Sequence, residues 1–212
     1  MTFPGNSSRM PSVLQDEWVT MKTDGLLKKT LIMLIAMIGL ALGIGFALPG
    51  TFHVERTLII DAAPDKVFPW VNDLTKWPKW DPWTRADPDI KHQYSGTQGV
   101  GHTQDWKGPR SGTGQLKVVT STHPKEIRVE LRTDKITASR LLTFTLKDLG
   151  EKTKLTWSIN GENNMKPIGN WFGLGMNKYL GPMYEQGLSN IKALTETGKL
   201  PPEVKPLKAP KE

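Results

Sequence analysis

Residues 70–83 read WVNDLTKWPKWDPW and contain four of the chain's eight tryptophans. Trp70 and Trp77 lie at helical spacing, which is typical of side chains that pack in a core. Trp80 and Trp83 flank an Asp-Pro pair, where the helical pattern ends. An irregular segment of this kind can place large rings either in the core or in the wall of a ligand site. The stretch therefore predicts an aromatic cluster with two alternative roles.

The segment before this cluster predicts a strand followed by a short helix. Residues 54–60, VERTLII, are rich in β-branched and apolar side chains, as strands are. Pro64 suits the first turn of a helix, and the apolar residues between positions 67 and 71 give that helix one buried face. One more helical turn is predicted over residues 74–80, before the proline at position 82 ends it.

From position 90 onward the pattern predicts one strand after another. Turn signals rich in Gly, Pro and Asp separate the strands. Ile127, Val129 and Leu131 alternate with charged residues, so one face of the predicted sheet is buried and the other faces solvent. The predicted strands cover residues 90–95, 100–107, 112–122, 125–132, 139–149 and 153–160.

The last long segment predicts an amphipathic helix. Apolar residues recur at helical spacing from Trp171 to Leu194, and Gly198 can end the helix. The order of elements predicts an α+β domain over residues 52–198, in which a curved antiparallel sheet wraps around the C-terminal helix. The Pro- and Lys-rich residues 199–212 are expected to be unstructured, as are residues 1–25.

An uncharged apolar run, LIMLIAMIGLALGIGFAL, covers residues 31–48. With its extension to position 26 it is long enough to cross a bilayer, so a transmembrane helix is predicted over residues 26–49. Lys22, Lys28 and Lys29 precede the run, whereas the charges that follow it nearly cancel. This asymmetry predicts a cytoplasmic N-terminus and an extracytoplasmic domain.

A cleaved signal peptide is the competing interpretation of this run. The sequence has no clear A-x-A cleavage site, and the run is longer than the usual apolar region of a signal peptide. An uncleaved anchor is therefore favoured. Met1 and Met21 both stay open as the start residue, because residues 21–29, MKTDGLLKK, would also make a natural charged segment before the apolar run.

Several kinds of catalytic or metal site are disfavoured. The chain has no cysteine, which excludes disulfides, thiolate nucleophiles and Cys-ligated zinc. The four histidines do not lie at metal-binding spacing and are expected at the surface, so no metal is predicted. Asp81, Asp87 and Asp89 are expected to form a solvated acidic loop rather than a calcium site. The glycines of residues 96–101 precede a strand rather than a helix, so they predict a hairpin and not a dinucleotide-binding loop.

The formal net charge of +7 does not predict nucleic-acid binding. Part of the positive charge lies in the C-terminal tail and in the N-terminal segment, and the rest is spread over many strands. The sequence shows no basic stripe interleaved with aromatic residues, which the binding of single strands requires.

Six motifs, in this order, resemble one protein family. They are VERTLIIDAAPDKVF (54–68), VNDLTKWPKWDPW (71–83), GTQGVG (96–101) leading to WKG (106–108), GTG (112–114), TKLTW (153–157) and YEQGLSNIK (184–192). Together they are similar to the polyketide cyclase/dehydrase branch of the SRPBCC, or START-like, superfamily over about residues 52–197. The resemblance implies a helix-grip fold with a deep, mostly apolar cavity between the sheet and the C-terminal helix.

The resemblance leaves two functions open, because the family contains ligand carriers, lipid-transfer domains and a minority of enzymes. One is a membrane-anchored module that holds a hydrophobic small molecule or lipid. The other is a cyclase/dehydrase-like enzyme that moves a proton on such a substrate in the same cavity. No acid–base pair is readable in the sequence, so the first is favoured, and no catalytic residue or cofactor is predicted.

The candidate residues of the implied cavity come from the tryptophan-rich stretch, from three predicted strands and from the predicted C-terminal helix. Polar groups could come from His102, Gln104 and Glu130, depending on the sheet face that each occupies. The oligomeric state and the identity of the ligand stay open. The cavity-lining candidates are Trp80, Trp83, Tyr94, Trp106, Trp157, Met176 and Tyr184.

Overall fold

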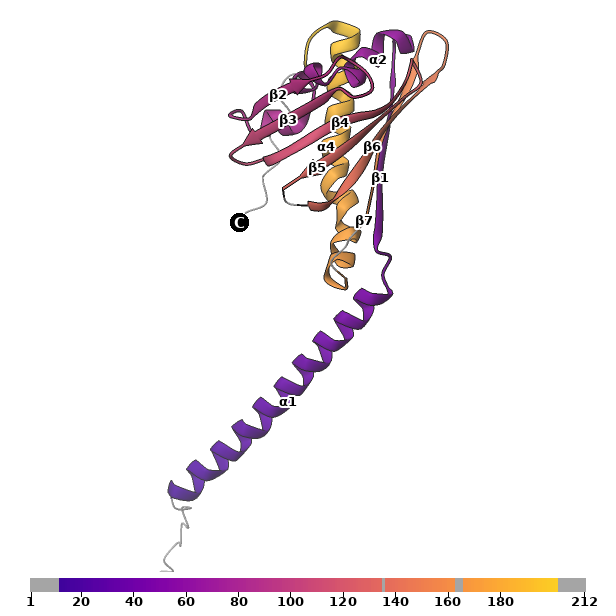
Figure 1. The fold of residues 1–212 in the computed structure, drawn as a ribbon. Helices are drawn as coiled ribbons and strands as arrows, with labels where there is room; N and C mark the ends of the chain where they lie inside the picture. The colour runs from indigo at the N-terminus through magenta and orange to yellow at the C-terminus, as the bar shows by residue number, and fades with distance from the viewer. Residues whose placement is uncertain (1–11, 135, 163–165, 202–212) are drawn as a thin grey trace, which may run out of the picture.

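The computed structural model describes residues 12–134, 136–162 and 166–201. A long helix, α1 (Ser12–Ala47), leads into an α+β domain in which a curved antiparallel sheet packs on a second long helix, α4 (Ile168–Thr197) (Figure 1). The predicted helix-grip fold is confirmed. Helix α1 also includes residues 12–25, which the sequence analysis had placed in an unstructured segment, because most of these residues are adequate helix formers. The remaining terminal residues, 1–11 and 202–212, lie outside the described residues.

All seven strands belong to one sheet, in the order β1-β7-β6-β5-β4-β3-β2. Strands β2 to β7 follow one another as a meander, and β1 pairs with β7 at the far edge. The strand predicted to begin at residue 100 begins three residues later, because Gly99 and Gly101 have positive φ and turn the chain. The strands are β1 (Thr51–Ile60), β2 (Lys91–Ser95), β3 (Thr103–Gly108), β4 (Gly112–Thr122), β5 (Glu126–Thr133), β6 (Ile136–Asp148) and β7 (Thr153–Glu162).

Three short helices connect β1 to β2, namely α2 (Pro64–Asn72), the 3-10 helix η1 (Leu74–Lys79) and α3 (Pro82–Ala86). The first two agree with the sequence pattern. The segment after Asp81 was expected to be irregular, and this was wrong. The Asp81 carboxylate accepts hydrogen bonds from the backbone N–H groups of Trp83 and Thr84, and this N-cap starts α3.

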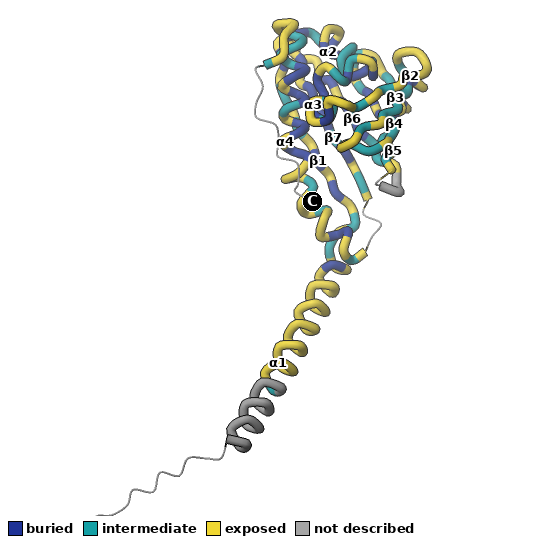
Figure 2. The backbone as a smooth tube through the Cα atoms, turned by 90° about the vertical axis from the view of Figure 1, so that its left-hand side faces the viewer, coloured by how far each residue is buried: buried dark blue, intermediate teal, exposed yellow. Residues whose placement is uncertain are grey.

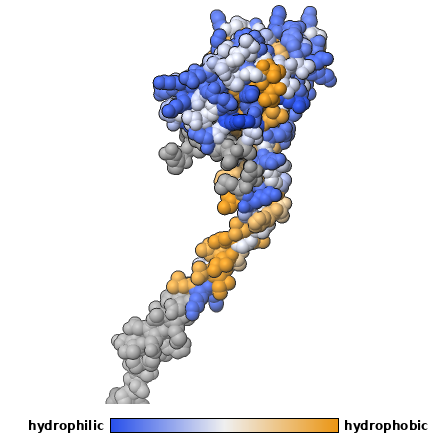
Figure 3. Space-filling view, in the orientation of Figure 1, coloured by the Kyte–Doolittle hydropathy of each residue, from blue (hydrophilic) through white to orange (hydrophobic). Residues whose placement is uncertain are grey.

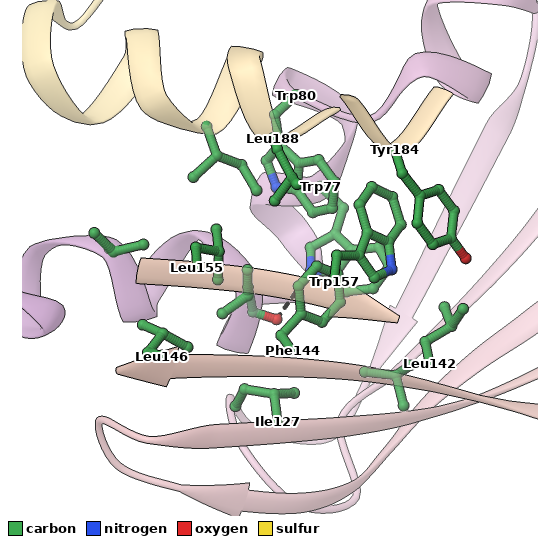
Figure 4. Packing of buried hydrophobic residues seen from close by; sticks show 14 of the residues in the cluster. Trp77, Trp80, Ile127, Leu142, Phe144, Leu146, Leu155, Trp157, Tyr184 and Leu188 are labelled. Carbon is green, nitrogen blue, oxygen red and sulfur yellow. Dashed lines mark hydrogen bonds between the residues drawn. The ribbon is translucent and has the colours of Figure 1, made fainter. Parts of the chain in front are cut away.

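The core lies between the concave face of the sheet and α4, and large aromatic rings dominate it (Figure 4). Tyr184 of α4 stacks on Trp157 of β7, with ring centroids 3.9 Å apart and planes inclined by 6°. Trp80 meets Trp157 nearly at a right angle, at 5.4 Å. Such pairs add about 0.5–1.5 kcal/mol each to the gain from buried area. Trp80 of the tryptophan-rich stretch therefore packs against the ring stack that joins α4 to the sheet.

Helix α1 extends away from the domain, and almost all of its side chains from Leu26 to Phe46 are exposed and apolar (Figures 2 and 3). Residues 25–47 are long and apolar enough to cross a membrane, by length and composition. The end of α1 contacts the start of α4, where Asn170 Nδ2 donates hydrogen bonds to the carbonyl oxygens of Gly45 (2.8 Å) and Leu48 (3.0 Å). The domain thus lies directly against the end of the apolar helix.

Gly187 allows α4 to approach the aromatic core closely. A Cβ atom at this position would lie 2.7 Å from Cζ3 of Trp157 and 3.5 Å from the nearest atoms of Trp80 and Pro82. Gly175 lies in the same helix, but nothing is within 4 Å of its Cβ position. The two glycines therefore differ in packing and share the same secondary structure.

Gly187→Ala is expected to lower the free energy of unfolding by about 1–3 kcal/mol, because the added methyl group would overlap the Trp157 ring. Gly175→Ala is the matched control and is expected to raise it by about 0.5–1 kcal/mol, since Ala favours a helix more than Gly does. Urea unfolding followed by tryptophan fluorescence measures both. Equal stability of the two variants would contradict the close approach of α4 to Trp157.

A buried carboxylate joins α3 to the hairpin between β3 and β4. Oδ2 of Asp87 accepts hydrogen bonds from the backbone N–H groups of Arg110 (3.0 Å) and Ser111 (2.8 Å). Burial by itself would raise the pKa of Asp87, but the hydrogen bonds from Ser111 and Arg110 outweigh it, so the pKa lies below its ordinary value. The expected solvated loop was wrong for Asp81 and Asp87, whose carboxylates are buried against N–H donors, and only Asp89 is exposed.

Because the pKa of Asp87 is lowered in the folded state, the ionised carboxylate stabilises the fold above the ordinary pKa of 3.8, and this contribution is lost as pH falls through the folded-state value. Asp87→Asn is therefore expected to reduce the free energy of unfolding by about 1–2 kcal/mol at neutral pH, with a smaller reduction in acid. Asp89→Asn, in the same loop, should change little at either pH. Urea unfolding at both pH values tests this, and a reduction for Asp87→Asn that is equally large in acid would contradict the role of the ionised group.

Candidate functional site

A cavity of about 360 Å³ lies between the concave face of the sheet and the first half of α4. This volume is within the range of small-molecule sites in proteins. Most of the wall is apolar, with Leu116, Leu142 and Ile159 contributed by the sheet and Met176 and Leu180 by α4. The cavity can therefore surround an apolar molecule of modest size.

The cavity occupies the half of the domain that faces α1. Its lining includes Thr133 at the end of β5, Arg140 near the start of β6 and Ile159 near the end of β7. These strand ends lie at the same end of the sheet as Thr51, the first residue of β1 after α1. The other half of the domain contains buried apolar side chains, among them Leu146 and Leu155. In Figure 4 these two lie on one side of the ring stack, and Leu142, which lines the cavity, lies on the other.

Five of the seven cavity-lining candidates do line the cavity, and two do not. Trp80 is completely buried below the wall, because its indole Nε1 donates a hydrogen bond to the Trp70 carbonyl oxygen (2.9 Å) and its ring faces the core. Tyr94 shares the concave face with His92, but it lies two residues farther along the edge strand β2, beyond the cavity, and is 39% exposed. The five residues in the wall are Trp83, Trp106, Trp157, Met176 and Tyr184.

The polar candidates divide according to the face of the sheet. Gln104 lines the cavity, and His102 is buried on the same face of the sheet. Glu130 lies on the opposite face, where it pairs with Arg132 (2.9 Å). The expectation that all histidines lie at the surface was thus wrong for His102, which is two residues from Gln104 and so points to the same, covered side of the sheet.

Four polar side chains form a chain of hydrogen bonds in the cavity wall. The Thr84 hydroxyl donates to Asp81 and lies 3.5 Å from Nε2 of His92, while Nε2 of Gln104 lies 2.8 Å from Nδ1 of His92. Burial lowers the pKa of His92, which favours the neutral imidazole, and burial raises the pKa of Asp81. Sequence reasoning missed this network because its members are far apart and form no motif. Its structural effect is to hold α3 against β2 and β3.

Arg140 is a further residue of the wall that the sequence analysis did not single out. It is half-buried, its guanidinium carbon lies 4.8 Å from the ring centroid of Phe52, and its Nε is buried without a hydrogen-bond partner. Burial lowers the pKa of Arg140, yet a guanidinium stays protonated in proteins. The alternation along β6 could have identified this residue, because Arg140 lies on the same face of the strand as Leu142 and Phe144, which point to the core.

In the part of the chain that the structure describes, no group of three or more His, Asp or Glu side chains could hold a metal ion. The polar side chains in the wall, among them Gln104, His92 and Arg140, are hydrogen-bond donors, acceptors and charges. Their arrangement can orient a bound molecule at one end while the apolar wall encloses the rest.

Comparisons with solved structures give similar folds at low sequence identity. A protein from Chromobacterium violaceum is 18% identical, with 69% of this chain and 97% of that chain covered and a TM-score of 0.46. The Aha1 dimer from Colwellia psychrerythraea is 19% identical, with 69% and 98% covered and a TM-score of 0.49. The protein XoxI from Bacillus cereus is 12% identical, with 69% and 96% covered and a TM-score of 0.49.

A search of curated proteins finds no match to this chain. A family model matches residues 51–196, and its description reads polyketide cyclase / dehydrase and lipid transport. The matched residues run from the first residue of β1 almost to the end of α4, which is the whole of the domain that contains the cavity. This chain therefore belongs to the polyketide cyclase/dehydrase and lipid transport family.

Proposed function

We propose that this protein is a membrane-anchored module that binds a hydrophobic small molecule or lipid in the cavity between the sheet and α4, and releases it chemically unchanged. The observation that carries the proposal is the cavity itself, with its aromatic and aliphatic wall and a volume of about 360 Å³. Removing apolar surface from water contributes about 25 cal/mol per Å², so an enclosed apolar ligand would be bound mainly by this term. The family description, which includes lipid transport, agrees with this function.

The membrane anchor in this proposal is α1. Its apolar stretch, residues 25–47, is exposed in the structure and has the length of a membrane span. Lys22, Lys28 and Lys29 precede this stretch, which favours a cytoplasmic N-terminus and an extracytoplasmic domain. Because the cavity occupies the half of the domain next to α1, a ligand dissolved in the bilayer would have a short path to it.

The cyclase/dehydrase-like alternative needs an acid or base that reaches the ligand. His92 is the best candidate, since it lines the cavity and burial lowers its pKa. Both of its ring nitrogens, however, face protein groups, Gln104 at 2.8 Å and Thr84 at 3.5 Å. The carboxylate of Asp81 accepts hydrogen bonds from the backbone N–H groups at the N-terminus of α3. These contacts occupy the groups that proton transfer would require, and they favour binding without chemistry.

Photolabelling of the full-length protein in lipid nanodiscs tests the proposal. A dodecanol analogue with a diazirine in its chain is expected to label both α1, from the bilayer, and the residues of the cavity. Trp83→Ala should reduce the affinity of the cavity for the probe, measured from the concentration dependence of labelling, by roughly 10- to 100-fold. This factor corresponds to the loss of about 1.5–3 kcal/mol from one large apolar side chain. Trp70→Ala is the matched control from the same stretch, because Trp70 is not among the lining residues.

Labelling of α1 alone, with no label in the cavity, would contradict the binding function. Mass spectrometry of the probe recovered without irradiation separates the two functions. An unchanged mass is expected of a carrier, whereas a changed mass that depends on His92 would favour the enzyme.

A further inference from the structure

We infer that the natural ligand is an amphipathic anion, with a carboxylate or phosphate group bound by Arg140 and Tyr184 and an apolar body in the rest of the cavity. This inference rests on the proposed function, since it names the chemical class of the molecule that the cavity holds. It is carried by the position of Arg140, a cation inside a mainly apolar wall.

Arg140 differs from the other arginines whose pairing the structure gives. Arg56, Arg128 and Arg132 form ion pairs with glutamates at 2.6, 3.0 and 2.9 Å, and all three pairs lie at the surface of the domain. Arg140 points inward, and the described residues provide no carboxylate partner for it. Arg140 instead makes a cation–π contact, in which its guanidinium carbon lies 4.8 Å from the centroid of the Phe52 ring.

A half-buried charge without a carboxylate partner loses part of its hydration, and a ligand anion would offset that loss. The Nε–H of Arg140 is buried and unpaired, so a donor is available without breaking a bond within the protein. A planar guanidinium matches the geometry of a carboxylate or phosphate and can bind it through two parallel hydrogen bonds. The same argument disfavours a cationic ligand, which Arg140 would repel.

Tyr184 supplies a second donor to the same region. Its ring is held by the stack on Trp157, and burial raises its pKa, so the phenol stays neutral and keeps its proton. Tyr184 from α4 and Arg140 from β6 both line the cavity, so the phenol and the guanidinium belong to the same wall. Both groups can therefore donate to one anion.

The remaining charged groups of the wall do not compete for this role. Asp81 is the acidic residue of the lining, and its carboxylate faces the N-terminus of α3. Arg110 also contributes to the lining, and its Nη1 donates to the carbonyl oxygen of Ala86 (3.0 Å). The apolar residues Leu116 and Met176 leave space in the cavity for the body of the ligand.

Paired photolabelling tests the inference on the full-length protein in nanodiscs of a zwitterionic lipid, at a pH where carboxylates are ionised. Diazirine analogues of dodecanoate, dodecyl phosphate and dodecanol are compared, and labelling of the cavity is divided by labelling of α1 to correct for partition into the bilayer. We expect one or both anions to exceed the alcohol by about tenfold or more, the value of a charge-assisted hydrogen bond. The better of the two anions identifies the head group.

Arg140→Gln is expected to reduce the ratio of anion to alcohol to about one while the alcohol still labels the cavity. Arg140→Lys should retain part of the preference, since it keeps the charge and loses the planar fork. Arg132→Gln, on the outer face of the sheet, is the matched control and should keep the full ratio. The wild-type ratio alone stays informative if Arg140→Gln fails to fold.

Each outcome has a separate meaning. Equal labelling by anion and alcohol in the wild-type protein would overturn the inference and leave the proposed binding function intact. Equal loss of both labels in a folded Arg140→Gln variant would also overturn it, because Arg140 would then only shape the cavity. No cavity label from any probe would overturn the binding function itself.

A second inference concerns the start of α4 and is carried by different residues. The structure assigns the exposed apolar side chains of this segment to the bilayer interface on the side where α1 ends. Ile168, Trp171, Phe172 and Leu174 are all exposed, and Phe172 reaches 70%. The inference rests on α1 spanning the membrane.

Hydrogen bonds fix this segment at the level of the last turns of α1. Nε1 of Trp171 donates to the carbonyl oxygen of Ala41 (3.2 Å), and Asn170 donates to those of Gly45 and Leu48. If α1 lies in the bilayer up to Ala47, the Trp171 ring lies at interface depth, where tryptophan is enriched in membrane proteins. Exposed apolar side chains at this depth contact lipid rather than water.

A single cysteine tests this position cleanly, because the chain has none of its own. Phe172→Cys and the control Lys199→Cys, just beyond the opposite end of α4, are labelled with a polarity-sensitive fluorophore in full-length protein in vesicles of phosphatidylcholine. We expect spin-labelled lipid to quench the label at position 172 several-fold more than the label at position 199, and aqueous iodide to show the reverse order.

Equal quenching at the two positions would overturn the assignment of this segment to the interface. Release of the protein from the vesicles by alkaline carbonate would instead overturn the membrane anchor, and with it this inference. The two failures are therefore distinguishable in one preparation.

Discussion

The stack of Trp157 on Tyr184 joins the sheet to α4 in the middle of the aromatic core. The ring centroids are 3.9 Å apart, and Trp80 and Phe144 pack on Trp157 from the core side at 5.4 and 5.0 Å. Both members of the stack also belong to the cavity wall. The same rings thus end the packed core and begin the cavity, so stability and the shape of the site depend on one arrangement.

The position of the cavity gives the apolar helix α1 a functional meaning. The first turns of α4 contact the end of α1 through Asn170, and a little farther along the same helix Met176 and Leu180 line the cavity. Only a short length of α4 therefore separates the end of the apolar helix from the interior of the domain. In the function that we propose, bilayer and cavity are two apolar environments linked by this segment.

Polar groups in the interior fall into two kinds. The carboxylate of Asp87 and the amide nitrogen of Asn190 have backbone partners, the latter at 2.8 Å from the Trp80 carbonyl oxygen, and they hold loops in place. Arg140 lacks such a partner at its Nε and faces the cavity. Oδ1 of Asp87 and Oδ1 of Asn190 are also buried without a partner, but neither residue lines the cavity. Arg140 differs because its unpaired donor belongs to a charged group in the cavity wall, where a ligand can complete the pairing.

The sequence by itself determined the order and type of the elements, the apolar helix and the family, because alternation, helical spacing and turn residues are local properties of the chain. Five of the seven candidates named from the sequence lie in the cavity wall. Only the tertiary structure separated Trp80, which is fully buried in the core, from Trp83, three residues later, which lines the cavity. The same holds for buried His102 and for Arg140, whose surroundings come from strands and helices distant in sequence. Which side chain fills the core and which faces an empty space depends on what packs opposite to it, and that is decided when α4 meets the sheet.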